Sequence, residues 1–211
     1  MNPKKTAVLL IEFQNDFTTP NGALHGAVKP VMESSNMMKN TKKVVDAAHE
    51  NGITVMHAPI TFQAGYNEIA KHPYGILKGV VDSTAFVKGS WGADFSADMK
   101  PEGDDIVIEG KRGLDTFCST NLDFILRSKG IENVVIAGFL TNCCVESTMR
   151  TAYEKGFNVF TLTDCTAATS QDEQDAAVKF TYPMFSKPIT SDNFIEMAHG
   201  EVAVADTSRG Y

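Results

Sequence analysis

Short apolar runs alternate with amphipathic stretches along the chain. The runs are rich in β-branched and aliphatic residues, as in T-A-V-L-L-I-E-F at 6–13, and suit strands buried on both faces of a parallel sheet. The predicted strands are 6–13, 53–57, 105–109, 134–136, 157–162 and 188–190. The predicted helices are 34–51, 116–129, 142–156, 171–180 and a last helix capped by Ser191 or Asp192. This order predicts an α/β fold of right-handed βαβ units, with helices on both sides of the sheet.

The segment between residues 58 and 102 breaks this regular pattern. It is richer in glycine, proline and aromatic residues than the elements that flank it. Long ordered loops in compact domains usually serve a function, so we expect this connection to shape a binding site. The pattern by itself leaves the order of the strands in the sheet open.

Composition and charge narrow the class of protein. With 211 residues, the chain fits a single domain, with a core at about 5–198 and a polar tail at 200–211. A net charge of −7 gives no electrostatic footprint for nucleic acid or for an anionic membrane surface. No apolar run approaches the ~20 residues of a membrane span, and no leader-like segment precedes the first strand. The four cysteines lack the spacing of a disulfide framework, so we expect a reduced, cytoplasmic protein.

Three chemically active side chains follow predicted strands: Glu12, Lys111 and Cys144. The carboxyl ends of parallel strands meet at one edge of the sheet, so these groups can converge. A lysine ammonium favours a thiolate, and a carboxylate can accept and return a proton while the thiolate attacks a carbonyl. Taken singly, Glu12 and Lys111 also fit a surface ion pair at the strand ends.

Cys143 and Cys144 lie at a strand-to-helix corner, within I-E-N-V-V-I-A-G-F-L-T-N-C-C-V-E-S-T at 131–148. Asn142 is the expected N-cap of the helix, and the start of a helix favours the thiolate form of a nearby cysteine. The alternative is that both cysteines are small buried side chains, since free cysteine is among the most buried residue types.

Three segments together resemble the isochorismatase-like cysteine hydrolases: I-E-F-Q-N-D-F at 11–17, G-K-R-G-L-D-T-F at 110–117 and G-F-L-T-N-C-C-V-E-S-T at 138–148. The resemblance runs in order from about Lys5 to about Glu196, and includes G-S-W-G-A-D-F at 89–95 and T-D-C-T-A-A at 163–168. It implies a Rossmann-like three-layer sandwich whose six-stranded parallel sheet has the order 3-2-1-4-5-6. It also implies a homodimer or a higher homo-oligomer.

The resemblance further implies a catalytic triad of acid, lysine and cysteine, which maps onto Glu12, Lys111 and Cys144. The motif selects Cys144 because its nucleophile follows the threonine by three residues and precedes V-E. The preceding cysteine then occupies a variable position. A cis peptide bond between Phe139 and Leu140 is implied too, together with an oxyanion site formed by the backbone N–H groups of Leu140 and Cys144.

Glu12 departs from the family pattern, in which the acid is normally an aspartate. The extra methylene moves the carboxylate by roughly one C–C bond, and reaction rates are sensitive to geometry on this scale. Three interpretations stay open: a site shifted to suit another substrate, an acid supplied by Asp16, or a weakened or inactive protein. We favour the first.

Metal-binding members of the family carry an Asp-x-His and a further histidine after the second strand. The corresponding segment here is H-A-P-I-T at 57–61, and the other histidines form no cluster with ligand spacing. We therefore expect no metal and no other cofactor, and we expect His57 to be a strand-end or core histidine.

Phe17, Trp91 and Phe117 lie beside the matched motifs and are candidates for an apolar wall around a small-molecule substrate. Ordinary core packing is the alternative, above all for Phe117, and Arg112 is expected to face solvent. The expected reaction is hydrolysis of a C–N bond in a small amide or ureido compound, through a thioester on Cys144. The alternatives are enol-ether hydrolysis of the isochorismatase type, and a weakened or non-catalytic binding protein on the same fold.

Overall fold

The first strand, β1 (Thr6–Ile11), lies in the middle of the sheet, and all six of its residues are buried. This computed structural model describes residues 1–200 of the chain. Its strands form a six-stranded sheet of order β3-β2-β1-β4-β5-β6, and every pairing is parallel. The other strands are β2 (Thr54–Ala58), β3 (Ile106–Val107), β4 (Asn133–Phe139), β5 (Asn158–Ala167) and β6 (Lys187–Ile189). The strand order that the resemblance implied is confirmed.

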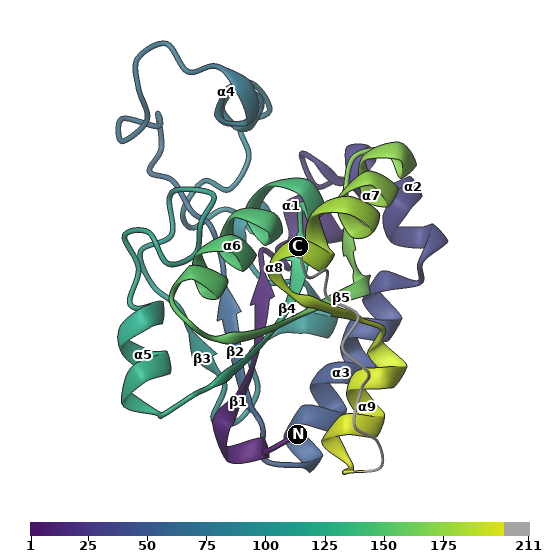
Figure 1. Ribbon diagram of the computed structural model, residues 1–211. Coiled ribbons are helices and arrows are strands. Elements are labelled where there is room, and N and C mark those ends of the chain that lie inside the picture. The colour runs from purple at the N-terminus through teal and green to yellow at the C-terminus, as the bar shows by residue number, and fades with distance from the viewer. Residues whose placement is uncertain (201–211) are drawn as a thin grey trace.

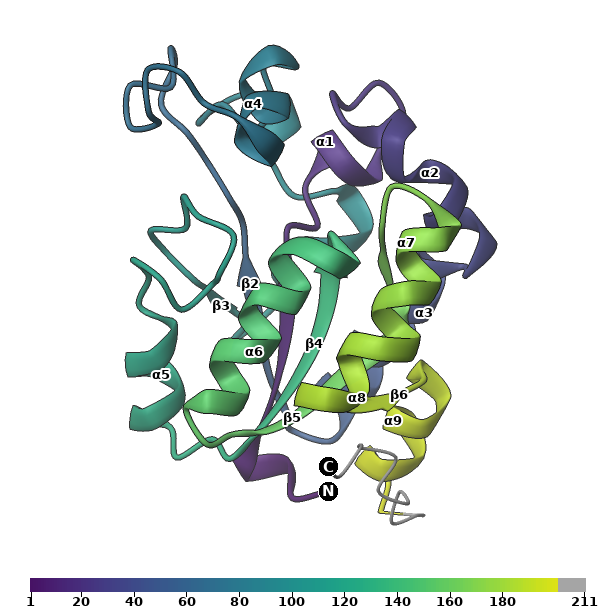
Figure 2. The same cartoon turned by 45° about the horizontal axis from the view of Figure 1, so that its top comes forward.

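Helices cover both faces of the sheet, which gives three layers (Figures 1 and 2). Successive side chains of a strand point to opposite faces, so β1 serves two cores. Val8 and Leu10 pack in one core, whose helices are α2 (His25–Ser34), α3 (Met37–Glu50) and α9 (Ser191–Ala198). Ala7, Leu9 and Ile11 pack in the other, whose helices are α5 (Leu122–Ser128), α6 (Glu146–Glu154) and α8 (Tyr182–Phe185).

The remaining elements are short. They are the helices α1 (Asn15–Thr18), α4 (Gly75–Asp82) and α7 (Gln171–Ala176), the 3-10 turns Pro3–Lys5, Trp91–Ala93 and Ala97–Met99, and the π-helical turns Thr141–Val145 and Ala177–Thr181. Helix α4 belongs to the long connection after β2 and projects beyond the carboxyl edge of the sheet (Figures 1 and 2). Within residues 1–200, no helix combines the length and the apolar character that crossing a membrane requires.

Two predicted helices begin elsewhere than expected. The helix expected at 116–129 begins only at Leu122. Before it, the Asp115 carboxylate accepts the N–H of Phe117 at 2.9 Å, and this side-chain bond favours a turn over a helix. The last helix is capped by Thr190 rather than by Ser191 or Asp192, because Thr190 forms a reciprocal capping box with Asn193.

Other boundaries also moved. The helix expected at 34–51 is α3, and α2 precedes it although Pro30 lies inside α2. The helix expected at 171–180 continues through a π-helical turn into α8. The connection at 58–102, expected to be irregular, contains α4. The predicted polar tail at 200–211 lies outside the described residues apart from Gly200.

Gly138 allows β1 and β4 to approach each other at the carboxyl edge. It pairs with Ile11 and has φ of 130°, and a Cβ added there would lie 2.0 Å from the carbonyl oxygen of Ile11. We therefore expect Gly138→Ala to lower the free energy of unfolding by about 3 kcal/mol. Urea denaturation measures the change.

Gly26 supplies the matched control for this substitution. It lies in α2, and a Cβ there would meet no atom within 4 Å. We expect Gly26→Ala to leave stability unchanged or to raise it by up to ~1 kcal/mol, since alanine favours helix. Equal stabilities for the two variants would contradict the close approach of the two strands.

Candidate active site

Glu12 immediately follows β1 at the carboxyl edge of the sheet. Its backbone N–H donates to the carbonyl of Ala58 at the end of β2, at 3.1 Å. Its φ is 62°, a left-handed conformation that is uncommon for residues other than glycine and costs of order 1–3 kcal/mol. Strained backbone of this kind concentrates at functional sites. The side chain is almost completely buried.

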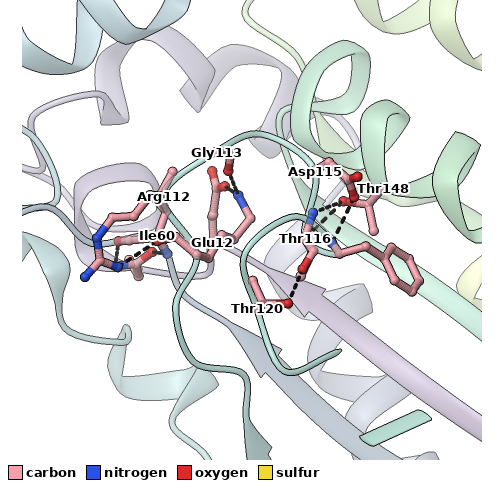
Figure 3. Close-up of polar contacts among 11 residues, drawn as sticks. Glu12, Ile60, Arg112, Gly113, Asp115, Thr116, Thr120 and Thr148 are labelled. Atoms are coloured by element: carbon pink, nitrogen blue, oxygen red, sulfur yellow. Dashed lines mark hydrogen bonds and ion pairs between the residues drawn. The ribbon is translucent and has the colours of Figure 1, made fainter. Parts of the chain in front are cut away.

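Lys111 forms a buried ion pair with Glu12. Its ammonium donates to the Glu12 carboxylate and, at 2.8 Å, to the carbonyl of Gly113, and Glu12 and Gly113 lie next to each other in Figure 3. The lysine side chain is 0% exposed, so the pair is not the surface ion pair that the strand ends also allowed. Burial lowers the pKa of Lys111, but the negative charge of Glu12 and its hydrogen bond act against burial, and the pKa lies above its ordinary value. The ammonium therefore stays charged.

Cys144 lies in the π-helical turn Thr141–Val145, between β4 and α6. Its side chain is buried, whereas that of Cys143 is partly exposed. Asn142 is not the N-cap that the sequence predicted: it lies inside this turn, with φ of −92° and ψ of 15°. The peptide bond between Phe139 and Leu140 is cis, as the resemblance implied.

The two neighbouring thiols share a hydrogen bond that divides their acidities. This bond, together with burial and the charge of Glu12, raises the pKa of Cys144 well above its ordinary value, and Lys111 offsets only part of the effect. The same bond lowers the pKa of Cys143. In the free site Cys144 therefore holds its proton, which differs from the expectation that the helix start and Lys111 favour its thiolate.

A small cavity of about 70 Å³ opens onto these groups. Its lining includes Glu12, Leu140 and Cys144, and of the three candidate wall residues it includes Phe17. Phe17 stacks on Phe139, with ring centroids 5.0 Å apart.

Trp91 and Phe117 do not line this cavity. Trp91 is 51% exposed and lines a separate hollow with Pro20. Phe117 stacks on Phe157 in the core that contains α5 and α6, with ring centroids 6.1 Å apart. The core-packing alternative therefore describes Phe117.

Arg112 does not simply face solvent. Its guanidinium donates to the hydroxyl of Thr61 at 3.2 Å and to the carbonyl of Lys111 at 3.0 Å. Its Nε also lies 3.4 Å from the carboxylate of Glu68. These contacts attach the loop at 110–117, which contains Lys111, to the long connection after β2.

A hydrogen-bond network of threonines joins the loop at 110–117 to α6, the helix that follows Cys143 and Cys144. The N–H of Thr116 donates to the hydroxyl of Thr148 on α6 at 3.0 Å, and that hydroxyl donates back to the hydroxyl of Thr116 (Figure 3). Next to it, Thr151 of α6 donates to the carboxylate of Asp115 at 2.9 Å. These bonds join the second half of the motif at 110–117 to α6, the helix that follows Cys144, and sequence reasoning did not predict them.

Asp16 is occupied away from the ion pair. Its carboxylate accepts the N–H groups of Ala23 at 2.9 Å and of Phe86 at 2.7 Å. It also fills the space beside Gly92, where a Cβ would lie 2.3 Å from its Oδ1. Asp16 therefore fastens three loops together, and the carboxylate at Lys111 is that of Glu12 alone among the described residues.

His57 is buried at the end of β2, as expected of a core histidine. Its Nε2 lies 3.0 Å from the Asp105 carboxylate, which also binds Nε2 of His49 at 2.7 Å. Burial lowers the pKa of His57 more than Asp105 raises it, so the imidazole is neutral. Among residues 1–200, no group of three or more His, Cys, Asp or Glu side chains is arranged to hold a metal ion.

Comparison with known proteins extends this picture. A family model described as the isochorismatase domain matches residues 6–193. The chain is 33% identical over 162 residues to the ureidoacrylate amidohydrolase RutB of Acinetobacter baylyi, an alignment that covers 72% of this chain and 66% of that enzyme. It is 28% identical to the ureidoacrylate amidohydrolase RutB of Agrobacterium fabrum, with 98% of this chain and 95% of that one covered. In three dimensions it is similar to a cysteine hydrolase from Pseudomonas syringae pv. phaseolicola, with a TM-score of 0.82, 20% identity and 96% of each chain covered.

Proposed function

The chain belongs to the isochorismatase family of hydrolases, and from that premise we propose that it hydrolyses the C–N bond of a small amide or ureido compound through a thioester on Cys144. One observation supports the proposal above all. The carboxylate of the buried Glu12–Lys111 ion pair and the buried thiol of Cys144 line the same cavity. A buried ion pair is weak evidence for stability, whereas convergence with a nucleophile is what acyl transfer requires.

The proposed reaction begins with a proton transfer. Glu12 takes the proton of the Cys144 thiol as the sulfur attacks the substrate carbonyl, and the ammonium of Lys111 stabilises the charge on the sulfur. The backbone N–H groups of Leu140 and Cys144 donate to the oxygen of the tetrahedral intermediate. Glu12 then returns its proton to the departing nitrogen, which leaves an acyl group on the sulfur. Water, deprotonated by Glu12, attacks the thioester, and the released sulfur regains the proton.

Glutamate in place of aspartate fits this role. The Glu12 carboxylate reaches the Lys111 ammonium, while Asp16 is held by backbone N–H groups elsewhere. We therefore favour a shifted site over an acid supplied by Asp16. The two relatives named as ureidoacrylate amidohydrolases support the amide or ureido class of substrate.

A substrate panel tests the proposal. Small primary amides, ureido compounds and isochorismate are incubated with the full chain, with ammonia release and loss of isochorismate as readouts. We expect ammonia release from an amide or a ureido compound. Turnover of isochorismate alone would favour the enol-ether reaction, and no turnover of any compound would favour a non-catalytic binding protein.

Removing Cys143 is expected to make Cys144 more acidic. The hydrogen bond from Cys143 is the largest cause of the raised pKa of Cys144, so Cys143→Ala lowers that pKa. The pH at which alkylation of Cys144 by iodoacetamide reaches half its maximal rate should therefore fall. Peptide mass mapping across pH measures it for Cys144 alone.

Cys118→Ala is the control for this shift, because Cys118 is an exposed cysteine outside the cavity lining. It should leave the pH profile of Cys144 unchanged. A profile that stays fixed or moves to higher pH in Cys143→Ala would contradict the coupling of the two thiols.

A further inference from the structure

The cavity is polar only at its reacting end. Its body is walled by aliphatic and aromatic side chains from the start of α2, from α4 and from the segment after α4. These apolar side chains include Leu24, Val28, Ile76, Leu77, Val80 and Phe86. Apart from Glu12 and the two thiols, the polar side chain in the lining is Thr169, whose hydroxyl donates to Glu173.

The described residues that line this cavity include no lysine, arginine or histidine, so none of them offers a positive partner to a charged group inside it. Lys111 does not line the cavity, and its ammonium donates to the carboxylate of Glu12 and to the carbonyl of Gly113. A second charged group in the substrate, far from the carbonyl under attack, would not reach it.

The hollow outside the cavity is no better suited to an anion. It has a volume of about 440 Å³ and shares Ile76, Leu77 and Leu114 with the cavity. Its arginine, Arg112, faces the carboxylate of Glu68, which lines the same hollow and neutralises it. The histidine that lines this hollow, His72, is exposed to solvent. A carboxylate placed here would lose hydration without gaining a free positive partner, and burying an unpaired charge is costly.

We infer that the site selects uncharged amides or ureas with a small apolar body, and rejects those that carry a carboxylate. The inference rests on the proposed function and deepens it by naming the substrate class. Ureidoacrylate, for which the two curated relatives are named, carries a carboxylate and is therefore a poor substrate for this chain. The specificity lies in α4 and the start of α2, the parts of the fold that the family motifs do not cover.

Matched pairs of compounds test the inference on the full chain. 4-Methylpentanamide and succinamate share an amide and a two-carbon spacer, and differ in an isopropyl group against a carboxylate. N-isobutylurea and N-carbamoylglycine form the same pair in the ureido class. In whichever class the protein hydrolyses, amide or ureido, we expect kcat/KM for the neutral compound to exceed kcat/KM for its anionic partner by at least about 100-fold. Equal or better turnover of the anions would overturn the inference and leave the proposed function standing.

A new cation on α4 should reverse part of this preference. Ile76 is 42% exposed and lines both the cavity and the outer hollow, so Ile76→Arg can place a guanidinium there without filling the core. We expect the kcat/KM ratio of succinamate to 4-methylpentanamide to rise by about 10-fold. Val81→Arg is the control, because Val81 lies on the same helix but lines a different hollow, and its ratio should not change.

Measurements of binding distinguish a failure of the inference from a failure of the proposed reaction. Calorimetric titration of Cys144→Ser with the same compounds measures the affinity of the cavity for each compound without turnover. Binding of the neutral compounds alone, with no hydrolysis by the wild type, would uphold the pocket and overturn the proposed function. Binding of the anions as tightly as their neutral partners, or an unchanged ratio in Ile76→Arg, would contradict the inference.

Discussion

Replacing Cys144 by serine is expected to lower kcat for amide or ureido hydrolysis by ~10⁴-fold or more, because the reaction loses its nucleophile. A serine hydroxyl is a much weaker acid than a thiol, and no histidine among the described residues lines the cavity to activate it. Steady-state ammonia release measures the loss. Retained turnover in this variant would support a reaction that does not pass through the thiol.

Cys143→Ser provides the control for that loss, since the two residues are neighbours that share a hydrogen bond. We expect this variant to keep kcat within about 10-fold of the wild type. Urea denaturation of both variants establishes that each is folded. An equal loss in the two variants would mean that the family motif does not distinguish the two cysteines.

The second large effect concerns the buried ion pair. Glu12→Gln leaves the Lys111 ammonium without its countercharge at a position that is 0% exposed, and Lys111→Met leaves the Glu12 carboxylate likewise unpaired. Removing one partner of a buried pair costs about 3–5 kcal/mol, so each single variant should lose that much unfolding free energy. Both should also lose activity, because the proton acceptor or the stabilising charge is gone.

The double variant, Glu12→Gln with Lys111→Met, is the decisive control. It leaves no unpaired charge, so we expect it to be more stable than either single variant and still inactive. Chemical denaturation of all four proteins yields the coupling energy. Losses of stability that simply add in the double variant would contradict a direct, buried contact between these two side chains.

The sheet was predictable because its strands are buried on both faces and their sequences follow that burial. β1 is a continuous apolar run with all six residues buried, and this pattern needs no partner to be recognised. The order of the strands depends on long-range contacts that periodicity does not report, and it came from the resemblance. The strand ends by themselves brought Glu12, Lys111 and Cys144 to one edge of the sheet, and the resemblance then assigned them to a triad.

Helices α2 and α4, which contribute to the cavity wall, were harder to predict, and the reasons lie in their sequences. Pro30 inside α2 reads as a helix breaker, although a neighbouring core can hold the helix around it. Helix α4 is short and has Gly79 within it, but the apolar spacing of I-L-x-x-V-V in Gly75–Asp82 is a helical signal that could have revealed it.

The side chains that complete the site depend on tertiary contacts. Trp91 and Phe117 adjoin matched motifs in the sequence, yet Trp91 lines a separate hollow and Phe117 packs in the core that contains α5 and α6. The bond between Thr116 and Thr148 joins residues 32 positions apart, and no local pattern predicts it. The hydrogen bond of the two thiols likewise depends on the turn that Thr141–Val145 adopts.

In the proposed reaction, the acyl group of the substrate passes through the sulfur of Cys144. The most direct test is rapid acid quenching of the enzyme during turnover of the best neutral amide or urea from the panel, followed by peptide mass mapping. We expect the mass of the substrate's acyl group on the peptide that contains Cys144, with fragmentation placing it on that residue and not on Cys143, and none in Cys144→Ser. An adduct located on Cys143 would contradict a thioester on Cys144, and so would turnover without any adduct when pre-steady-state ammonia release shows a burst.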